Sequence, residues 1–441
     1  MTYFNYKNEP VRDILMIDAK SFYASCECVA LNKHPLKTML IVASTADNAG
    51  QGLVLAASPL AKKVLGISNV TRLNNVPRHK DLIIVSPRMN YYMEINLQIN
   101  NIFREYVADE DLLVYSIDES ILDVTKSLNL FFPDKKMSRQ EKRWRLARRI
   151  QLEVKEKTGI YLTIGIGDNP LLAKLALDNY AKHTKSFIDE IRYEDVPGKV
   201  WKIDSMTDFW GIGEKTKENL RNINIWSIKE LAHADPGKLK KKFGVMGLQL
   251  YHHANGIDRT ILSEPAPKVK EKSFGNSQVL PRDYHLQNEI EVVIKEMAEQ
   301  VGARIRKQGC KTGCVRLYIG FSFSESEKGF TNQLAILYTD STKILQQHLI
   351  HIFRTNYDNQ VVRYIGVTYT KLSYSNSVQL NLFDAPDDSI KEEKIDAIVD
   401  KIRDKYGFTS IVRANSLSDG SRAIARDSLV GGHEGGKETD E

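Results

Sequence analysis

Cysteine is scarce in this sequence, with only four in 441 residues: Cys26, Cys28, Cys310 and Cys314. A secreted protein of this length that depends on disulfides would usually contain more. The C-x-C and C-x-x-x-C spacings leave a zinc site open as an alternative. Both pairs adjoin apolar segments, "SFYAS" and "CVRLYIGF", which favours buried free thiols instead.

Long apolar runs are also lacking. No stretch approaches the roughly 20 apolar residues that a membrane-spanning helix needs. The N-terminal segment "MTYFNYKNEPVRD" carries acids and a proline where a secretory signal would have an apolar core. We therefore expect a cytoplasmic protein with no membrane partner.

A strong excess of one charge is absent too, but the charge is unevenly distributed. The net charge is +6. From residue 384 to the end there are 14 acidic and 9 basic residues, a charge of −5, so residues 1–383 carry +11. A basic body of this kind suits a polyanionic partner such as nucleic acid, although a solvated Lys/Arg surface would give the same count.

Hydrophobic periodicity predicts an α+β multidomain protein. Strands and amphipathic helices over about the first 190 residues indicate an antiparallel sheet with helices, interrupted by a small β/α insertion at 28–88. From about residue 196 the sequence reads as helical, on both sides of a Gly-Ile-Gly, and residues 263–272 read as a linker. Residues 273–372 predict a second α/β unit. A helix is expected at 390–405, and the Gly-rich end from residue 429 is expected to be mobile.

Three acids stand at strand ends in the first unit. Asp18 closes an apolar strand, and Asp118 and Glu119 sit between two β-forming segments in "LLVYSIDESILDV". If the first strand pairs beside that hairpin, the three carboxylates meet at one edge of the sheet, where their repulsion calls for a cation. Two Mg²⁺ ions that serve phosphoryl transfer would meet that need. An acid-rich surface turn is the alternative.

The segments "IDAKSFYASCE" and "YSIDESILDVT" resemble the two catalytic signatures of the Y-family translesion DNA polymerases, with the bacterial UmuC-type branch closest. The resemblance extends from about residue 14 to residue 383. It implies a template-directed DNA polymerase of low fidelity, built from a palm, small fingers, a helical thumb with a helix-hairpin-helix, and an α/β little finger. By position these would be the palm at 1–27 and 89–195, fingers at 28–88, thumb at 196–262, linker at 263–272, little finger at 273–372 and a tail at 373–441.

The same resemblance assigns the reaction centre. Asp18, Asp118 and Glu119 would be the catalytic carboxylates and would hold two Mg²⁺ ions, to one of which the carbonyl of Ala19 would add. One ion would activate the primer 3′-hydroxyl, and the other would hold the triphosphate. For Ala19, the alternative is an ordinary residue after the end of a strand. For Phe22 and Tyr23, which follow, the alternative is two core aromatics on a helix.

The resemblance also assigns the nucleotide pocket. Tyr23, with Phe22 beside it, would be the aromatic ring that excludes a ribose 2′-hydroxyl. Lys182 resembles the lysine that reaches the triphosphate. The finger contact departs from the family pattern, in which a Tyr precedes an Arg by three residues, so Lys62 and Lys63 are both candidates.

Further motifs resemble the DNA-holding parts of the family. "FWGIGEKTKENL" resembles the thumb hairpin, in which glycine backbone amides and lysines meet a phosphate. The little-finger segment 265–316 has ten basic and six acidic residues and would add a salt-sensitive grip. The pentapeptide "QLNLF" resembles the bacterial sliding-clamp-binding peptide. The candidates are Gly211, Gly213, Lys215, Lys217, Lys272 and Arg282 for DNA, and Gln379, Leu380, Leu382 and Phe383 for the clamp.

The expected partners are primer–template DNA, deoxynucleoside triphosphates and the sliding clamp, with other damage-response proteins left open. Two further hypotheses compete with this one. A two-metal nucleotidyl cyclase would share the carboxylates but would have no use for a thumb hairpin or a basic third unit. A non-catalytic DNA-binding protein that recruits the clamp would have no need of all three carboxylates.

Overall fold

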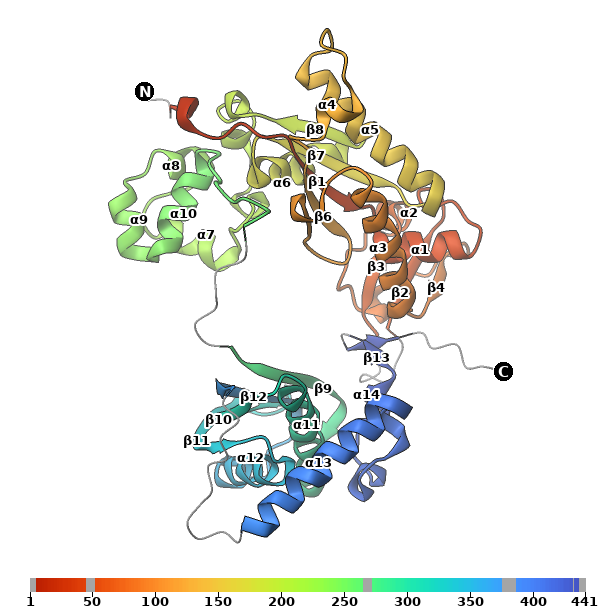
Figure 1. The fold of residues 1–441 in the computed structure, drawn as a ribbon, viewed down its shortest axis with the longest axis vertical. Coiled ribbons are helices and arrows are strands. Elements are labelled where there is room, and N and C mark those ends of the chain that lie inside the picture. The colour runs from red at the N-terminus through yellow and green to blue at the C-terminus, as the bar shows by residue number, and fades with distance from the viewer. Residues whose placement is uncertain (1–4, 45–51, 265–271, 375–385, 431, 436–441) are drawn as a thin grey trace.

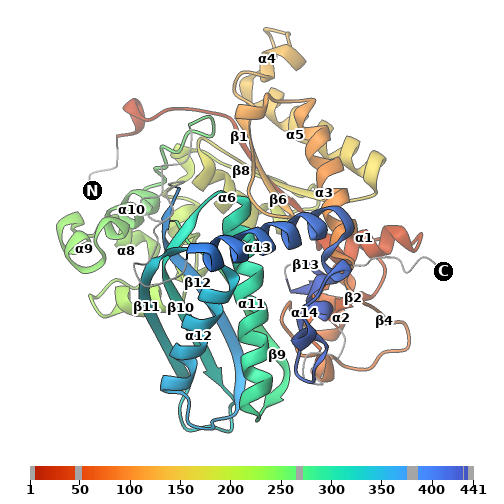
Figure 2. The same ribbon diagram turned by 60° about the horizontal axis from the view of Figure 1, so that its bottom comes forward.

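The computed structural model describes residues 5–44, 52–264, 272–374, 386–430 and 432–435. Sheets and helices are mixed throughout, which confirms the predicted α+β fold. Figure 1 shows two halves, with residues 5–264 in the upper half and the unit that begins at residue 272 in the lower half. The turned view in Figure 2 shows the C-terminal segment passing from the lower half toward the first. None of the described helices has the length and apolar character that a membrane span requires.

A five-stranded sheet of order β5-β6-β1-β7-β8 forms the centre of the first half. Neighbouring strands are antiparallel except β7 and β8, which are parallel. The predicted antiparallel sheet is found in β5, β6, β1 and β7, whereas the β8 edge is parallel, because the crossover helix α6 returns the chain to the same end of the sheet. The elements are β1 (Ile14–Ala19), α3 (Met89–Arg104), β5 (Leu112–Val114), β6 (Glu119–Asp123), α4 (Leu128–Phe131), α5 (Arg139–Thr158), β7 (Leu162–Gly167), α6 (Pro170–Asn179) and β8 (Ile188–Ile191).

Helices cover both faces of this sheet, which explains the unbroken apolar run of β1. Leu15 and Ile17 belong to the core shared with α3 and α5, whereas Ile14 and Met16 pack with residues of α6 on the other face. Helix α6 lies so close to β7 that a Cβ atom on Gly165 would sit 2.1 Å from a backbone oxygen of α6. Only glycine fits at that approach, so the packing of α6 against the sheet is fixed there.

A three-stranded sheet of order β3-β2-β4 forms the insertion between β1 and α3. Its strand β2 is antiparallel to β3 and parallel to β4, and the sheet has a small apolar core of its own with α2. The elements are α1 (Phe22–Ala30), β2 (Leu40–Ala43), β3 (Val54–Ala57), α2 (Pro59–Leu65) and β4 (Ile83–Val85).

Short helices follow the five-stranded sheet: α7 (Glu214–Arg221), α8 (Ile228–Ala232), α9 (Pro236–Phe243) and α10 (Val245–Ala254). They form one core with the start of α6. The predicted helix before the Gly-Ile-Gly is wrong, because the segment from residue 196 to that loop contains two 3₁₀ turns, Val200–Lys202 and Met206–Asp208, and no α-helix. Tight 3₁₀ turns are common connectors where the chain has too few residues for an α-helix.

A four-stranded antiparallel sheet of order β11-β10-β12-β9 forms the second half. Helices α11 and α12 cover one face with a continuous apolar core. A groove on the other face is lined by Gly275, Asn276, Ser277, Arg316, Tyr318, Tyr364, Gly366 and Thr368. The elements are β9 (Phe274–Tyr284), α11 (Gln287–Lys307), β10 (Lys311–Phe321), β11 (Gly329–Thr339), α12 (Thr342–Asn356) and β12 (Val362–Ser373).

The C-terminal segment packs back on the protein. Helix α13 (Pro386–Tyr406) accepts the Arg306 side chain of α11 through Asp396 and Asp400, so the expected helix does dock. It is followed by α14 (Ala423–Asp427) and by a hairpin of β13 (Leu429–Val430) and β14 (His433–Glu434). Val430 packs against the core of the first half, and the Gly435 carbonyl accepts a hydrogen bond of 3.0 Å from the Asn90 amide. The predicted mobility of the end is therefore wrong for the described part of 429–435, because these tertiary contacts hold it.

All four cysteines are buried free thiols, as expected. Within the described residues, no three His, Cys, Asp or Glu side chains are arranged to hold a metal ion, so the zinc alternative finds no support there.

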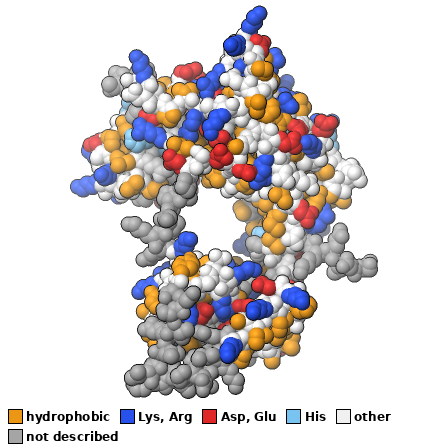
Figure 3. Space-filling view, in the orientation of Figure 1, with side chains coloured by type: hydrophobic (Ala, Val, Ile, Leu, Met, Phe, Trp, Pro, Cys, Tyr) orange, Lys and Arg blue, Asp and Glu red, His pale blue; other side chains and the backbone are white. Residues whose placement is uncertain are grey.

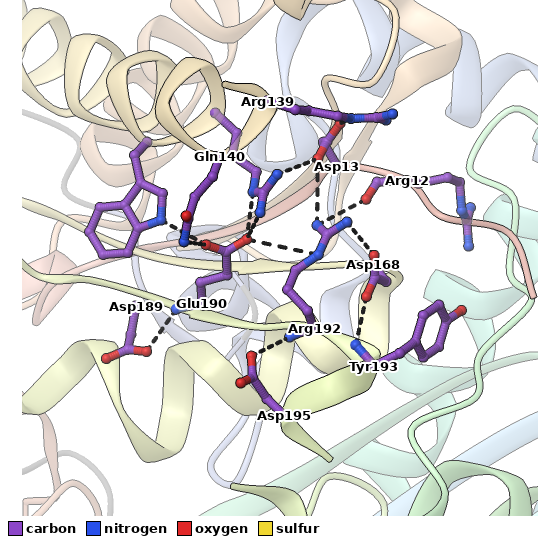
Figure 4. Close-up of polar contacts among 12 residues, drawn as sticks. Arg12, Asp13, Arg139, Gln140, Asp168, Asp189, Glu190, Arg192, Tyr193 and Asp195 are labelled. Carbon is purple, nitrogen blue, oxygen red and sulfur yellow. Dashed lines mark hydrogen bonds and ion pairs between the residues drawn. The ribbon is translucent and has the colours of Figure 1, made fainter. Parts of the chain in front are cut away.

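A buried network of ion pairs holds the five-stranded sheet together at the end remote from Asp18 (Figure 4). Asp13, which precedes β1, is fully buried and pairs with arginines from α5 and with Arg192, which follows β8. Glu190 of β8 pairs with Arg143 and accepts a hydrogen bond of 2.8 Å from the Trp144 indole. The network thus ties β1 and β8 to α5.

Replacement of Glu190 by alanine should lower the free energy of unfolding by about 3–5 kcal/mol, because it leaves the buried Arg143 guanidinium without its main partner. Urea unfolding would show this as a lower midpoint at unchanged slope. Glu141→Ala is the matched control, since it breaks an exposed pair with Arg145 on the same helix and should cost about 0.5 kcal/mol or less. Equal costs for the two variants would contradict a stabilising role for the network.

Candidate active site

The three predicted carboxylates lie at one end of β1 and β6. Asp18 is the direct cross-strand partner of Glu119 in the antiparallel register. The Ala19 amide donates a hydrogen bond of 2.8 Å to the Asp118 carbonyl. The structure therefore brings Asp18, Asp118 and Glu119 from segments about a hundred residues apart to the same edge of the sheet.

The turn that carries Asp118 is held by Ser116 and by a contact from α3. The Ser116 hydroxyl donates 2.8 Å to the Asp118 carboxylate and accepts 3.0 Å from the Glu119 amide. The Asn96 side chain of α3 donates to the Ile117 carbonyl at 2.8 Å. The acidic pair thus sits on a fixed turn, and this explains why two residues that are poor strand formers interrupt the hairpin.

Lysines from α6 and the turn after it form ion pairs with the acids. Lys174 Nζ lies 2.5 Å from Glu119 Oε1 and 3.1 Å from Asp178. Lys182 Nζ lies 2.8 Å from Asp178 and 3.6 Å from Asp18 Oδ2. Lys182 is where the sequence predicts a basic group, whereas Lys174 and Asp178 were missed. The i, i+4 spacing of Lys174, Asp178 and Lys182 was the available signal.

The charges at this site are not balanced. The pKa of Asp18 is raised to about 6, chiefly by burial; Lys182 opposes the rise, and the charges of Asp118 and Glu119 contribute to it. Additional positive charge would stabilise the ionised form of a carboxylate in this setting. The donor set, three carboxylates and a backbone carbonyl on adjacent strands, consists of the oxygen ligands that Mg²⁺ prefers. By residue type and strand position they therefore fit a divalent cation. In their present rotamers, however, the three side chains do not converge on one point, because Glu119 and Asp18 are turned toward lysines.

A cavity of about 980 Å³ opens beside the acids. Asp18 and Asp118 line one side of it, and α2 contributes lysines on another. Phe22 and Tyr23, at the start of α1, form part of its wall, and Tyr23 is the more exposed of the two. The predicted site residues that line the cavity are Asp18, Ala19, Phe22, Tyr23, Lys62, Lys63, Asp118 and Lys182.

The cavity also contains a lysine that the sequence reading did not single out. Lys20 lines the wall directly after the acid strand. Burial lowers the pKa of Lys20 and of Lys62, while the Asp18 carboxylate raises both. An anionic ligand that enters this cavity would thus meet several partly desolvated ammonium groups.

A second cavity of about 840 Å³ lies beside the Gly-Ile-Gly loop. Its lining includes Asp178 and His183 as well as Gly211 and Gly213. A side chain at either glycine would meet open space, and Gly211 has a φ of +92° that favours glycine. The backbone of this loop is therefore open to close approach by a ligand.

The other predicted DNA contacts differ in their surroundings. Lys215 and Lys272 are exposed, and Lys217 pairs with Glu214 at 2.6 Å. Arg282 pairs with the buried Glu289 and lies over the Tyr284 ring. The clamp-binding candidates Gln379, Leu380, Leu382 and Phe383 lie outside the described residues.

Comparison with known proteins gives the family. The sequence model described as the impB/mucB/samB family matches residues 17–178, and that of its C-terminal domain matches residues 271–382. The chain is 38% identical to "Putative UV-damage repair protein UvrX" of Bacillus subtilis (strain 168), over 97% of this chain and 99% of that protein. It is 34% identical to DNA polymerase IV 2 of the same organism, over 95% of this chain and 98% of that protein.

A solved structure shares the fold. The Y-family DNA polymerase chimera Dbh-Dpo4(243-245)-Dbh superposes with a TM-score of 0.64 at 22% identity, and the match covers 82% of this chain and all of that one. At this identity the likeness speaks for the fold alone. Together with the matches in sequence, it shows that the chain belongs to the Y-family DNA polymerases.

Proposed function

We propose that this protein is a template-directed DNA polymerase of low fidelity, which adds deoxynucleotides to a primer 3′-end and acts in translesion synthesis. One observation supports this above all others. In a chain of this family, the carboxylates of Asp18 in β1 and of Asp118, just before β6, share a single cavity with an aromatic wall and lysines. An acid pair, a ring and ammonium groups suit the sugar and triphosphate of one incoming nucleotide.

The family uses divalent metal ions, and here we assign them to Asp18, Asp118, Glu119 and the Ala19 carbonyl as two Mg²⁺ ions. When bound, such ions supply charge stabilisation for in-line displacement at a phosphoryl centre. The protein's part is to fix the ligands on two paired strands and on the Ser116 turn. With a metal ion on Asp18, Lys182 would stay paired with Asp178 at 2.8 Å, and the other hydrogens of its ammonium group would be available to the triphosphate.

The remaining groups of the cavity bind and select the nucleotide. Lys62 and Lys63 from α2, together with Lys182, place positive charge where a triphosphate would lie. Tyr23 presents its ring to the same space and excludes a ribose 2′-hydroxyl by steric overlap. We infer that sugar selection is performed by shape, without an attractive contact.

The DNA path follows from the open geometry. Figure 3 shows an opening between the two halves, with Lys and Arg side chains along both edges. We assign the phosphate contacts of the duplex to the Gly211–Gly213 loop with Lys215 and Lys217, and to Lys272 and Arg282 of the second half. The uncovered sheet face with Arg316 and Tyr318 offers a further surface for the backbone of DNA.

We propose the following domain boundaries: palm 1–27 and 89–195, fingers 28–88, thumb 196–262, linker 263–272, little finger 273–372 and tail 373–441. The small fingers are the feature that bears on fidelity. In their described residues, 28–44 and 52–88, they have three strands, one short α-helix besides α1 and one 3₁₀ turn, and so have little bulk to enclose a nascent base pair. This supports tolerance of damaged templates.

Primer extension on a template that contains a single abasic site tests this function. We expect extension past the lesion in Mg²⁺ buffer, at a rate within about tenfold to a hundredfold of the undamaged template, since loss of one base removes roughly 1–3 kcal/mol of stacking. Full copying of undamaged DNA with a complete stop at the lesion would contradict the translesion part. Absence of any extension would contradict the polymerase assignment.

We further propose that residues 379–383 bind the sliding clamp through Leu380, Leu382 and Phe383. Their deletion should lower clamp-stimulated synthesis on long primed DNA by roughly tenfold or more, because tethering to the clamp supplies effective concentration. Synthesis without the clamp should be unchanged, and deletion of the five residues 437–441 is the length-matched control. Equal loss with and without the clamp would point to a defect of folding and would refute the assignment.

A further inference from the structure

Tyr23 does not stand alone in the cavity wall, because its ring rests on a second tyrosine. The ring centroids of Tyr23 and Tyr92 are 4.5 Å apart, and the ring planes are only 15° from parallel. Tyr92 is fully buried and does not line the cavity. It therefore backs one face of the Tyr23 ring.

Tyr92 is itself held in place by a buried acid. Its hydroxyl donates a hydrogen bond of 2.7 Å to Glu27 Oε1. Burial and this hydrogen bond raise the pKa of Tyr92, so the hydroxyl keeps its proton and remains a donor. The Glu27 carboxylate is 3% exposed and could not be left uncompensated at this position.

Arg88 supplies that compensation. Its guanidinium forms a two-pronged contact with Glu27, at 3.0 Å through Nε and 2.7 Å through Nη2. It also lies 4.6 Å over the ring of Tyr91. A bidentate pair fixes orientation as well as distance, so the Glu27 carboxylate has a single position in which to accept from Tyr92.

Helix geometry explains why these four side chains meet. Tyr23 and Glu27 are four residues apart on α1, and Arg88 and Tyr92 are four residues apart at the start of α3. Residues at this spacing lie one above the other on a helix face. The two pairs therefore face each other across the contact between α1 and α3. Helix α1 carries the sugar-excluding ring of Tyr23, and α3 covers the catalytic sheet.

We propose that Tyr92, fixed by Glu27 and Arg88, is a positioning residue that sets the place of the Tyr23 ring and thereby the discrimination against ribonucleotides. This rests on the assignment of Tyr23 as the sugar-excluding ring. A half-buried tyrosine with no backing could turn about χ1 and give way to a 2′-hydroxyl. A fully buried ring stacked behind it removes that freedom, because core side chains are close-packed and cannot yield.

The test compares kcat/KM for ribonucleotides and deoxynucleotides in primer extension. Tyr92→Leu should raise the ribonucleotide-to-deoxynucleotide ratio by about tenfold, since a small displacement of a positioned group changes rates on this scale. Tyr92→Phe keeps the ring and should stay close to the wild-type ratio. Tyr92→Met, whose flexible chain refills the core without a flat face, should behave like Tyr92→Leu and serves if the leucine variant is poorly folded.

Tyr106→Leu is the matched control. Tyr106 is also a buried tyrosine in the same core, with its hydroxyl bonded to a carboxylate, Glu153, but it lies beyond the C-terminal end of α3 and does not line the cavity. It should lower stability without a change in the sugar ratio. An unchanged ratio in Tyr92→Leu and Tyr92→Met, or an equal rise in Tyr106→Leu, would overturn the proposal. If Tyr23→Ala raises the ratio and the Tyr92 variants do not, only the positioning role fails. If Tyr23→Ala leaves it unchanged, the sugar-gate assignment fails as well.

Discussion

Asp118→Asn should bind primer–template DNA normally and fail to extend it, with a fall in rate of about a thousandfold. The asparagine keeps the size of the side chain and can still accept the hydrogen bond from Ser116. It loses the negative charge that a divalent cation needs, and metal stabilisation of the transition state is worth several kcal/mol, which corresponds to roughly 10³ in rate. Single-turnover incorporation would measure the loss, and fluorescence anisotropy would measure DNA affinity.

Asp123→Asn is the control for this experiment. Asp123 ends β6, the strand that follows Asp118, at the opposite end of the sheet, where it pairs in register with Ile14 and its carboxylate accepts a hydrogen bond from the Thr125 amide. The rate should be close to that of the wild type. If Asp118→Asn keeps more than about a tenth of the wild-type rate, loss of the carboxylate has cost less than ~1.4 kcal/mol, and the metal-ligand assignment is wrong.

Tyr23→Ala should raise the ratio of ribonucleotide to deoxynucleotide incorporation by about 10- to 100-fold. Forcing an extra atom into occupied space costs roughly 1–3 kcal/mol, and removal of the ring returns that free energy to the ribonucleotide. The rate of deoxynucleotide incorporation should change much less than this ratio, because the deoxyribose loses only a packing contact. Competition assays with both nucleotide types on one template would give the ratio directly.

Tyr23→Phe should retain the selectivity, since the ring remains and the hydroxyl is not the obstructing part. If Tyr23→Phe lost as much selectivity as Tyr23→Ala, the hydroxyl would be the selecting group, and steric exclusion by the ring would be refuted. Phe22 is a weaker candidate for the same role, because it is almost fully buried in the core.

The acids and their strands could be predicted from sequence because the signal is local. Asp18 follows an apolar run, and the Asp118–Glu119 pair interrupts two β-forming segments, so their edge positions follow from chain order and antiparallel pairing. The lysines opposite them were harder to find. Lys174 lies within an apolar helix and reaches Glu119 only through the close packing of α6 on β7, which Gly165 permits. Such contacts depend on tertiary structure.

The C-terminal segment shows the limit of composition. Its Gly-rich end reads as mobile, yet the hairpin at 429–435 contacts both the core and α3 of the first half.

The stacking of Tyr92 behind the sugar-excluding ring of Tyr23 could not be predicted from the sequence either. Tyr92 is an ordinary apolar position of an amphipathic helix in sequence, and its role follows from the partner that α1 brings opposite to it. The parallel strand β8 was missed because pairing direction is set by the crossover, not by local pattern.

A crystal of the protein with primer–template, a non-hydrolysable deoxynucleotide analogue and Mn²⁺ would locate the metal directly by anomalous scattering. We expect peaks at about 2–2.5 Å from oxygens of Asp18, Asp118 and Glu119, with Lys174 withdrawn from Glu119. Peaks bound elsewhere, with the ion pair between Lys174 and Glu119 intact beside a bound triphosphate, would contradict the assignment of these three carboxylates as the metal cradle.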